Sequence, residues 1–272
     1  IDSSKKFFLI DNAQIVVTGK INDILDNLES IYLDENKIDV IYHDAFGEII
    51  EKPDYSVDAS VSVENIINKY IDLIGGKDKL EKVESIESNG NANINMQGQS
   101  FVLEFYSLKN NQNQSLNTIT AGGMVVQRNV FNKYQGYNEV NGQRMPLTDS
   151  ELEQAIINSA LFSELNYDFS TIELVGTSSV DDQKAYEIKI TDNKTEYYSV
   201  ESGLKIKEVE MQEIEGNQLA IETTIKEYEE VDGILIPKEI NQVTPTLPIP
   251  GGITIKFNNI KLNVKTSDSD FN

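Results

Sequence analysis

The strongest constraint on the fold is a series of short segments in which apolar and polar residues alternate. These segments are residues 101–106, 124–126, 130–131, 172–175, 186–190, 197–200, 204–211, 220–228, 234–243, 253–257 and 260–264. Turn-forming pairs, such as Asp192 with Asn193 and Asp232 with Gly233, recur at intervals of roughly 8 to 14 residues. Alternation with a period of two is typical of half-buried strands, so the pattern predicts an antiparallel meander.

Two further segments predict helices that cover this sheet. The first begins at Ser62 or Glu64, carries an apolar stripe, and ends at Gly75 and Gly76. The second opens with a capping box, in which Glu151 follows Thr148 by three residues. Its apolar stripe comprises Leu152, Ala155, Ile156, Ser159, Leu161 and Phe162. We therefore expect a mainly β (α+β) fold, a curled antiparallel sheet or incomplete β-barrel of about ten strands covered by helices.

The first 52 residues predict a small strand-helix-strand appendage. A β-branched run over residues 14–19 and a second run over 38–42 are the strands, and Asn22 caps the helix between them. Residues 53–61 are polar, include Pro53 and show no periodicity, which indicates a linker before a β-domain over 62–272. The sequence starts at Ile1 without a signal peptide, so we expect a piece of a longer polypeptide.

Composition excludes several classes of function. The chain has 45 acidic and 23 basic residues, for a net charge of -22, and only two arginines, so it lacks the basic patch that nucleic acids require. It has no cysteine and one histidine, which rules out thiolate sites and a two-histidine zinc site. No run of residues is apolar for long enough to cross a bilayer. We expect no cofactor, no metal and no catalytic residue.

Two groups of residues could still suggest chemistry. His43 beside Asp44 could act in acid–base catalysis, but no nucleophile or second base accompanies it in a motif. Glu208 and Glu210 could form a carboxylate pair, but they alternate with apolar residues, which predicts the solvated face of a strand. We interpret both groups as structural.

Several turn-and-strand motifs resemble the LolA/LolB-like family of outer-membrane lipoprotein-sorting proteins. The motifs are a helix ending at 74–76 followed by residues 80–90, the pairs of strands at 175–190 and 197–210, and the segments 228–237 and 255–263. The resemblance covers residues 62–272. It implies an incomplete β-barrel lined with apolar residues, with helices as a lid, which holds the acyl chains of lipoproteins crossing the periplasm.

Residues 1–52 are similar to the C-terminal end of insulinase/pitrilysin-type zinc peptidases. The similarity rests on residues 15–19, an amphipathic helix to Leu28, and residues 41–47. Those enzymes need an H-x-x-E-H helix, which this sequence lacks. The resemblance implies a non-catalytic part of a peptidase-like polypeptide.

The residues expected to face the inside of the sheet are the candidate ligand site. The predicted apolar groove consists of Phe101, Leu103, Phe105, Tyr186, Ile188, Leu204 and Ile206, and the predicted lid of Leu152, Ile156 and Phe162. The same residues could equally form a solidly packed core, because small barrels are usually filled.

Three functions are compatible with this sequence. The favoured one is a non-catalytic binding module of the Gram-negative envelope, periplasmic or associated with the outer membrane, with an apolar groove for acyl chains or lipoproteins. A second is a C-terminal accessory domain of a zinc peptidase, acting in substrate handling or assembly beside a peptidase domain of the same polypeptide. A third is a structural module of an envelope complex.

Overall fold

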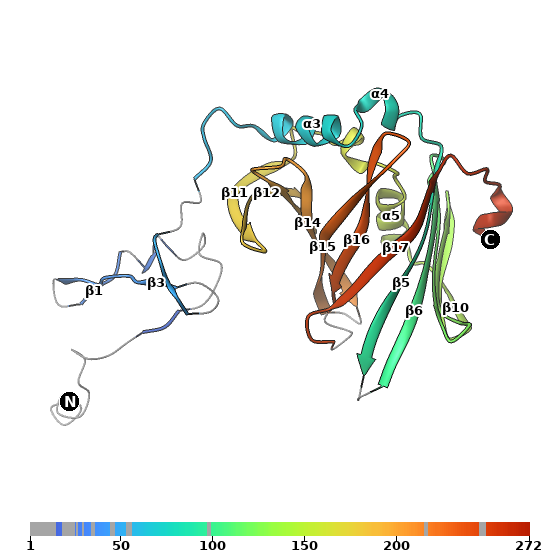
Figure 1. Cartoon of the computed structure of the whole chain (residues 1–272), viewed down its shortest axis with the longest axis horizontal. Coiled ribbons are helices and arrows are strands. Elements are labelled where there is room, and N and C mark those ends of the chain that lie inside the picture. Colours follow the sequence, from blue (N-terminus) through green and yellow to red (C-terminus); the bar gives the residue numbers. More distant parts are fainter. Residues whose placement is uncertain are drawn as a thin grey trace. The chain divides into compact units, whose positions relative to one another are not determined.

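One antiparallel sheet dominates the computed structural model (Figure 1), and in the described residues it has 13 strands. In chain order they are β5 (Ser85–Met96), β6 (Gln99–Asn110), β7 (Gln114–Ala121), β8 (Met124–Asn132), β9 (Gln135–Val140), β10 (Gln143–Pro146), β11 (Glu173–Val180), β12 (Gln183–Thr191), β13 (Lys194–Ser199), β14 (Lys205–Ile214), β15 (Asn217–Val231), β16 (Ile234–Val243) and β17 (Ile253–Leu262). Their spatial order is β10-β9-β8-β7-β6-β5-β17-β16-β15-β14-β13-β12-β11. Strands consecutive in sequence therefore lie side by side, except that β10 and β11 lie at opposite edges and the first strand, β5, pairs with the last, β17.

The structure describes residues 15–17, 25, 27–28, 30–33, 36–43, 47–52, 56–96, 99–214, 217–244 and 249–272. The chain divides into two compact units, Ile1–Tyr55 and Ser56–Asn272, and the large sheet belongs to the second. Each unit is described by itself below.

The mainly β prediction is confirmed, and the sheet is open rather than closed into a barrel, with 13 strands in the described residues where about ten were expected. Strands β5, β7 and β9 were not predicted, because polar residues such as Asn, Gln, Ser and Thr interrupt their apolar alternation, and β10 was not predicted because it has only four residues. The two strands predicted at 253–257 and 260–264 are one strand, β17, interrupted by a register shift between Phe257 and Asn259. Such a β-bulge breaks the alternation that the prediction relied on.

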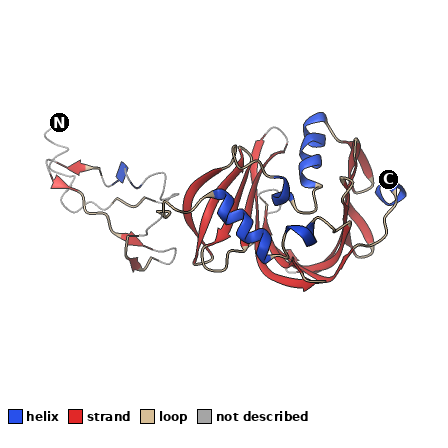
Figure 2. Cartoon of the chain, turned by 90° about the horizontal axis from the view of Figure 1, so that it is seen from above, coloured by secondary structure: helices blue, strands red, loops and turns tan. Residues whose placement is uncertain are grey.

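The strands curve around the helices at residues 63–73 and 149–158, which lie on the inner, concave side of the sheet (Figure 2). The helix α3 (Val63–Leu73) begins at the N-cap Ser62, one of the two predicted starts, and the Ser62 side-chain oxygen accepts a hydrogen bond from Asn65 N. Its apolar stripe is buried against the sheet. The buried residues of this stripe are Ile66, Ile67, Tyr70 and Ile71. A short helix α4 (Lys77–Leu80) follows and adds the buried Leu80.

The helix α5 (Asp149–Asn158) has the predicted capping box between Thr148 and Glu151. It is much less buried than α3, since Ile156 and Ile157 are 47% and 51% exposed. Leu161 and Phe162 lie beyond its end, in the segment leading to the 3-10 helix η2 (Ser163–Asn166). A second 3-10 helix, η3 (Asp268–Phe271), packs its Phe271 against the opposite face of β6 and β8.

Cross-strand register defines the concave face of the central strands. Ala92 is opposite Leu103, and Ile94 is opposite Phe101. Directly opposed residues point to the same face of a sheet. Ala92 and Ile94 form a buried cluster with Ile253 and Ile255, against which Leu103 and Phe105 pack. The part of the concave face formed by these residues of β5, β6 and β17 is therefore apolar.

The first unit contains short strands in its described residues. They are β1 (Tyr32–Leu33), β2 (Asn36–Lys37), β3 (Tyr42–His43) and β4 (Ile49–Ile50), paired as β1 with β2 and β3 with β4. Ile15–Val17, within the strand predicted at 14–19, are exposed and not in a strand, and the rest of that segment lies outside the described residues. The strand predicted at 38–42 is displaced to Tyr42–His43.

Candidate functional site

One cavity of about 360 Å³ lies where the C-terminal end of α5 and the segment leading to η2 approach the concave face of the sheet. Residues of α3, β5, β6, α5, η2, β13, β14 and β16 line it, so elements far apart in the sequence meet there. Its volume is at the lower end of the range of small-molecule pockets, about 300 to 1,000 Å³. It is large enough for one chain-like ligand.

One part of the cavity wall is apolar. Its residues are Tyr70, Ile74, Ile86, Ile157, Ala160, Leu161, Phe162, Leu235, Ile236 and Pro237. Ile74 and Ile236 are buried in the main core of the unit, whereas Ile157 is half exposed on α5. The apolar wall is thus fixed on the sheet side and carried by a loosely packed helix on the other.

The other part of the wall is a network of buried charges. Lys205 Nζ donates hydrogen bonds to Glu164 Oε1 (2.7 Å) and Glu196 Oε1 (3.2 Å), and it lies 3.6 Å from Glu208 Oε2. Lys194 Nζ lies 3.0 Å from Glu196 Oε1 and 3.6 Å from Glu208 Oε2. The Glu196 side chain is fully buried. Two ammonium groups therefore neutralise most of the charge of three carboxylates.

Two tyrosine hydroxyls also donate hydrogen bonds to Glu196. The Tyr167 hydroxyl donates to Glu196 Oε1 at 2.8 Å, and the Tyr198 hydroxyl donates to Oε2. The Tyr198 ring meets the edge of Tyr70, with ring centroids 5.3 Å apart. Buried carboxylates need such partners, since an unpaired one would cost several kcal/mol.

Three groups at the centre of the network, Glu196, Lys205 and Tyr198, keep one protonation state around neutral pH. Burial alone would raise the pKa of Glu196, but Lys205 and Lys194 outweigh it and lower this pKa from 4.5 to about 2. Burial would lower the pKa of Lys205, but Glu164 and Glu196 raise it well above its usual value. Burial also raises the pKa of Tyr198 well above its usual value. A general acid or base needs a pKa near the working pH, so this network is suited to holding structure in place.

The end of α5 is tied to two distant strands. Lys109 Nζ, on β6, donates to the Asn158 carbonyl oxygen at 2.8 Å. Glu210 Oε1, on β14, accepts from Gln154 Nε2 (2.9 Å) and from Asn158 Nδ2 (3.2 Å). The strands β6 and β14 are separated by β5, β17, β16 and β15 in the sheet. The last turn of α5 therefore bridges the concave face beside the cavity.

The structure places Phe101, Leu103 and Phe105 of the predicted groove on the same face of β6 as Lys109. This apolar strip continues along the concave face away from the cavity and does not line it. Phe101 is 43% exposed, while Leu103 and Phe105 are half-buried.

The other predicted groove residues lie at the opposite end of the sheet. Ile188 is fully buried in the main core, and Tyr186 and Leu204 pack against that core. Ile206, by contrast, is half-buried and stands at the register shift between β13 and β14. These residues do not line the cavity. The structure thus divides the predicted groove into two regions, one on β6 and one under α3.

Of the predicted lid residues, Phe162 lines the cavity. Leu152 is half-buried on α5, and Ile156 is exposed and points elsewhere than into the cavity. Its neighbour Ile157 lines the cavity instead. The predicted stripe continued to residues 161 and 162, but α5 ends at Asn158, so these two residues lie beyond the helix.

The interpretation of Glu208 and Glu210 as solvated was wrong. Both line the cavity, because β14 pairs its residues Glu208 and Glu210 with Glu196 and Lys194 on the concave face. The alternation of apolar and polar residues separated the two faces of the strand, but it did not show which face lies on the concave side of the sheet. The network itself was missed in the sequence, because its members come from η2, β13 and β14 and form no local motif.

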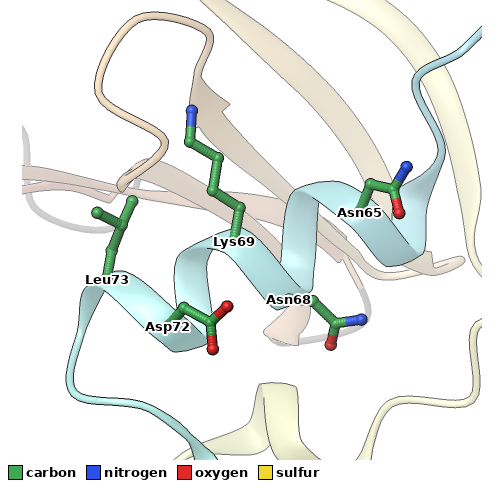
Figure 3. Close-up of a pocket in the computed structure, with 5 residues that line it drawn as sticks. All are labelled: Asn65, Asn68, Lys69, Asp72 and Leu73. Carbon is green, nitrogen blue, oxygen red and sulfur yellow. The ribbon is translucent and has the colours of Figure 1, made fainter.

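A second hollow, of about 500 Å³, lies on α3 (Figure 3). Its five lining residues, Asn65, Asn68, Lys69, Asp72 and Leu73, all come from this one helix. A hollow without a second wall cannot enclose a ligand, so we prefer the cavity beside α5 as the candidate site.

His43 is exposed, and its Nδ1 lies 2.8 Å from the Gly47 carbonyl oxygen within the β3–β4 pair. In the part of the chain that the structure describes, no group of three or more His, Cys, Asp or Glu side chains could hold a metal ion. None of the described helices has the length and apolarity needed to cross a bilayer.

Comparison with known proteins finds likeness in structure alone. No family model matches the sequence, and no curated protein matches it. A LolA-superfamily protein from Nitrosomonas europaea is similar in structure, with a TM-score of 0.51 and 14% identity, over 78% of this chain and 98% of the other. A DUF1329-family protein from Desulfovibrio piger is similar with a TM-score of 0.50 and 13% identity, over 78% of this chain and 98% of the other.

The comparisons give no support to a peptidase-like segment at residues 1–52. The chain therefore has the fold of the LolA superfamily.

Proposed function

We propose that this protein is a non-catalytic binding module of the bacterial envelope that holds an acyl chain of a lipid or lipoprotein on the concave side of its sheet. The observation that carries the proposal is the cavity beside α5, with an apolar wall contributed by both the core and a half-exposed helix. The LolA-superfamily fold supports the same reading, and with it a periplasmic or outer-membrane-associated location.

The construction of the cavity favours binding over catalysis. Its charged groups are mostly paired with one another. The pKa of Glu196 is lowered and that of Lys205 is raised, so both values lie further from neutral pH than usual. An acyl chain in the cavity would cover the half-exposed Ile157 of α5, and each CH₂ buried contributes about 0.8 kcal/mol. The apolar strip on β6, with Phe101, Leu103 and Phe105, extends the surface along which a longer chain can lie.

The test uses delipidated full-length chain and a neutral apolar fluorophore, 1-N-phenylnaphthylamine. We expect saturable fluorescence enhancement that 1-dodecanol and a diacyl lipopeptide reverse by competition. Absence of saturable binding, or enhancement that neither competitor reverses, contradicts the proposal.

Two neighbouring residues provide a matched pair of variants for locating the site. Ile157 lines the cavity and Ile156 does not, yet their exposed fractions are similar. We expect Ile157→Asp to weaken binding by about tenfold or more, since burial of an aliphatic side chain contributes about 1.5 to 3 kcal/mol. Ile156→Asp should change the affinity little. Equal weakening by both variants would locate the ligand elsewhere on α5.

A further inference from the structure

Three lysines line the cavity, and their surroundings differ. Lys194 and Lys205 each lie within 4 Å of two or more carboxylates. Lys109 has no carboxylate within that distance among the described residues, and its one hydrogen bond is to the Asn158 carbonyl oxygen. That bond caps the end of α5, which accounts for one of the three N–H groups of the ammonium. Two N–H groups remain for a ligand.

The charge of Lys109 is poorly compensated by the protein. Burial lowers its pKa; Lys194 and Lys205 lower it further, and Glu208 and Glu210 only partly offset this. The Oε1 atom of Glu210 accepts from Gln154 and Asn158 rather than from Lys109. A buried ammonium without a close counter-charge is costly, so binding of an anion there would be favourable.

Lys109 also stands beside the apolar wall. In the register of β5 and β6 it is directly opposite Ile86, and both residues line the cavity. On the other side, its partner Asn158 follows Ile157 at the end of α5. A ligand with its tail against Ile86 and Ile157 would therefore place its head next to the Lys109 ammonium.

We infer that the cavity binds a single-chain amphiphile with an anionic headgroup, a carboxylate or a phosphate, which Lys109 Nζ holds while the chain lies against Ile86 and Ile157. The inference rests on the proposed function and adds the headgroup class to it. Carboxylate and phosphate share the charge-assisted hydrogen bonds that an ammonium donates. Glu208 lies near Lys194 and Lys205, and Glu210 accepts from the amides of Gln154 and Asn158, so neither carboxylate is a close partner of Lys109.

The first experiment compares four twelve-carbon amphiphiles on the delipidated full-length chain, each below its micelle concentration. The ligands are dodecanoate, dodecyl phosphate, 1-dodecanol and dodecyltrimethylammonium, and each displaces 1-N-phenylnaphthylamine. We expect at least one of the two anions to bind about 10- to 100-fold more tightly than the alcohol, the range of a charged hydrogen bond. The tighter anion identifies the headgroup source. Equal affinity of the alcohol and both anions, or tighter binding of the cation, overturns the inference.

The second experiment removes the charge. Lys109→Met keeps a long flexible side chain without an ammonium, and it should reduce the affinity for the preferred anion by about tenfold or more while leaving that for dodecanol unchanged. Lys109→Arg should retain most of the preference for anions. Lys261→Met is the control, because Lys261 is exposed on β17 and pairs with Glu87 away from the cavity. A loss of anion and alcohol binding in equal measure overturns the inference.

The series separates failure of this inference from failure of the proposed function. If dodecanol binds but the anions have no advantage, the acyl-chain site stands and the headgroup assignment is wrong. If no twelve-carbon ligand displaces the fluorophore, the proposed function itself is wrong. The comparison of ligands on the unmodified chain does not depend on any variant being folded.

Discussion

Lys205 is the residue on which most of the buried charge network depends. Its ammonium contacts Glu164, Glu196 and Glu208, so Lys205→Met would leave buried carboxylates without their main cation. Removal of one partner from a buried ion pair costs about 3 to 5 kcal/mol, and we expect a loss of that size in the free energy of unfolding, measured by urea denaturation.

An exposed ion pair provides the control for this substitution. Lys261 and Glu87 lie 3.1 Å apart, with the Lys261 side chain 55% exposed. Exposed pairs contribute about 0 to 1 kcal/mol, so Lys261→Met should change the free energy of unfolding by less than about 1 kcal/mol. Similar losses in the two variants would show that the network adds no more to stability than a surface pair.

Glu196 should give the network a dependence on pH. Its pKa in the folded protein is about 2, against an ordinary value of 4.5. Because the folded-state pKa is depressed, this stabilisation is fully present above about pH 4.5 and is lost as the pH falls towards 2. In urea denaturation from pH 6 to pH 2, the wild type should therefore lose its advantage over Glu196→Gln in this window. A difference that stays constant over the range would contradict the shift.

The chemistry of single residues was only partly predictable from the sequence. The caps Ser62 and Thr148 could be predicted because a cap involves neighbours within three residues. The Lys205–Glu196 contact could not, since it depends on the pairing of β13 with β14 and on a register shift beside Lys205. Alternation also does not reveal that charged residues of β14 face inward.

At the scale of elements, hairpins were more predictable than strands. Asp232 and Gly233 have positive φ values in the turn where they were expected, and Asp and Gly tolerate that conformation better than most other residues. Strands β7 and β9 were missed because their inward positions include polar side chains that bond to one another across the sheet. Asn117 accepts from Ser107, and Asn138 accepts from Asn129, so polar pairs take the place of apolar ones.

The helices α3 and α5 should differ in how they respond to loss of a cap. Ser62→Ala removes the acceptor for Asn65 N, and Thr148→Ala removes the acceptor for Glu151 N. Each change costs its helix about 1 kcal/mol. Because α3 carries a buried stripe and α5 exposes Ile156 and Ile157, we expect Ser62→Ala to lower global stability. Thr148→Ala should act mainly by local opening of α5.

Hydrogen exchange followed by mass spectrometry distinguishes the two responses. Thr148→Ala should accelerate exchange over residues 149–158 with little change in the urea midpoint, while Ser62→Ala should shift the midpoint. If Thr148→Ala instead shifts the midpoint as much as Ser62→Ala does, α5 is an integral part of the core and not a separately opening cover.

The whole sheet is open, and its two edges differ in how they avoid pairing with other chains. The edge strand β10 is only four residues long and ends at Pro146, which lacks a backbone donor. The other edge strand, β11, has a register shift between Leu174 and Gly176. Short strands, proline and bulges all reduce edge-to-edge association. The open architecture thus leaves the concave face accessible without exposing long unprotected edges.

The unit Ser56–Asn272 should fold by itself. Within the described residues, its three clusters of buried apolar side chains draw on no residue before Val61. We expect a chain of residues 56–272 to keep the urea midpoint and the fluorophore affinity of the full-length chain. A chain of residues 77–272 is the contrasting case, because it lacks the four buried side chains of α3, each contributing about 1.5 to 3 kcal/mol. Their loss, about 6 to 12 kcal/mol together, is comparable with the whole stability of a domain, so this shorter chain should not fold cooperatively. A marked fall in the midpoint of the 56–272 chain would show that the first 55 residues stabilise the sheet.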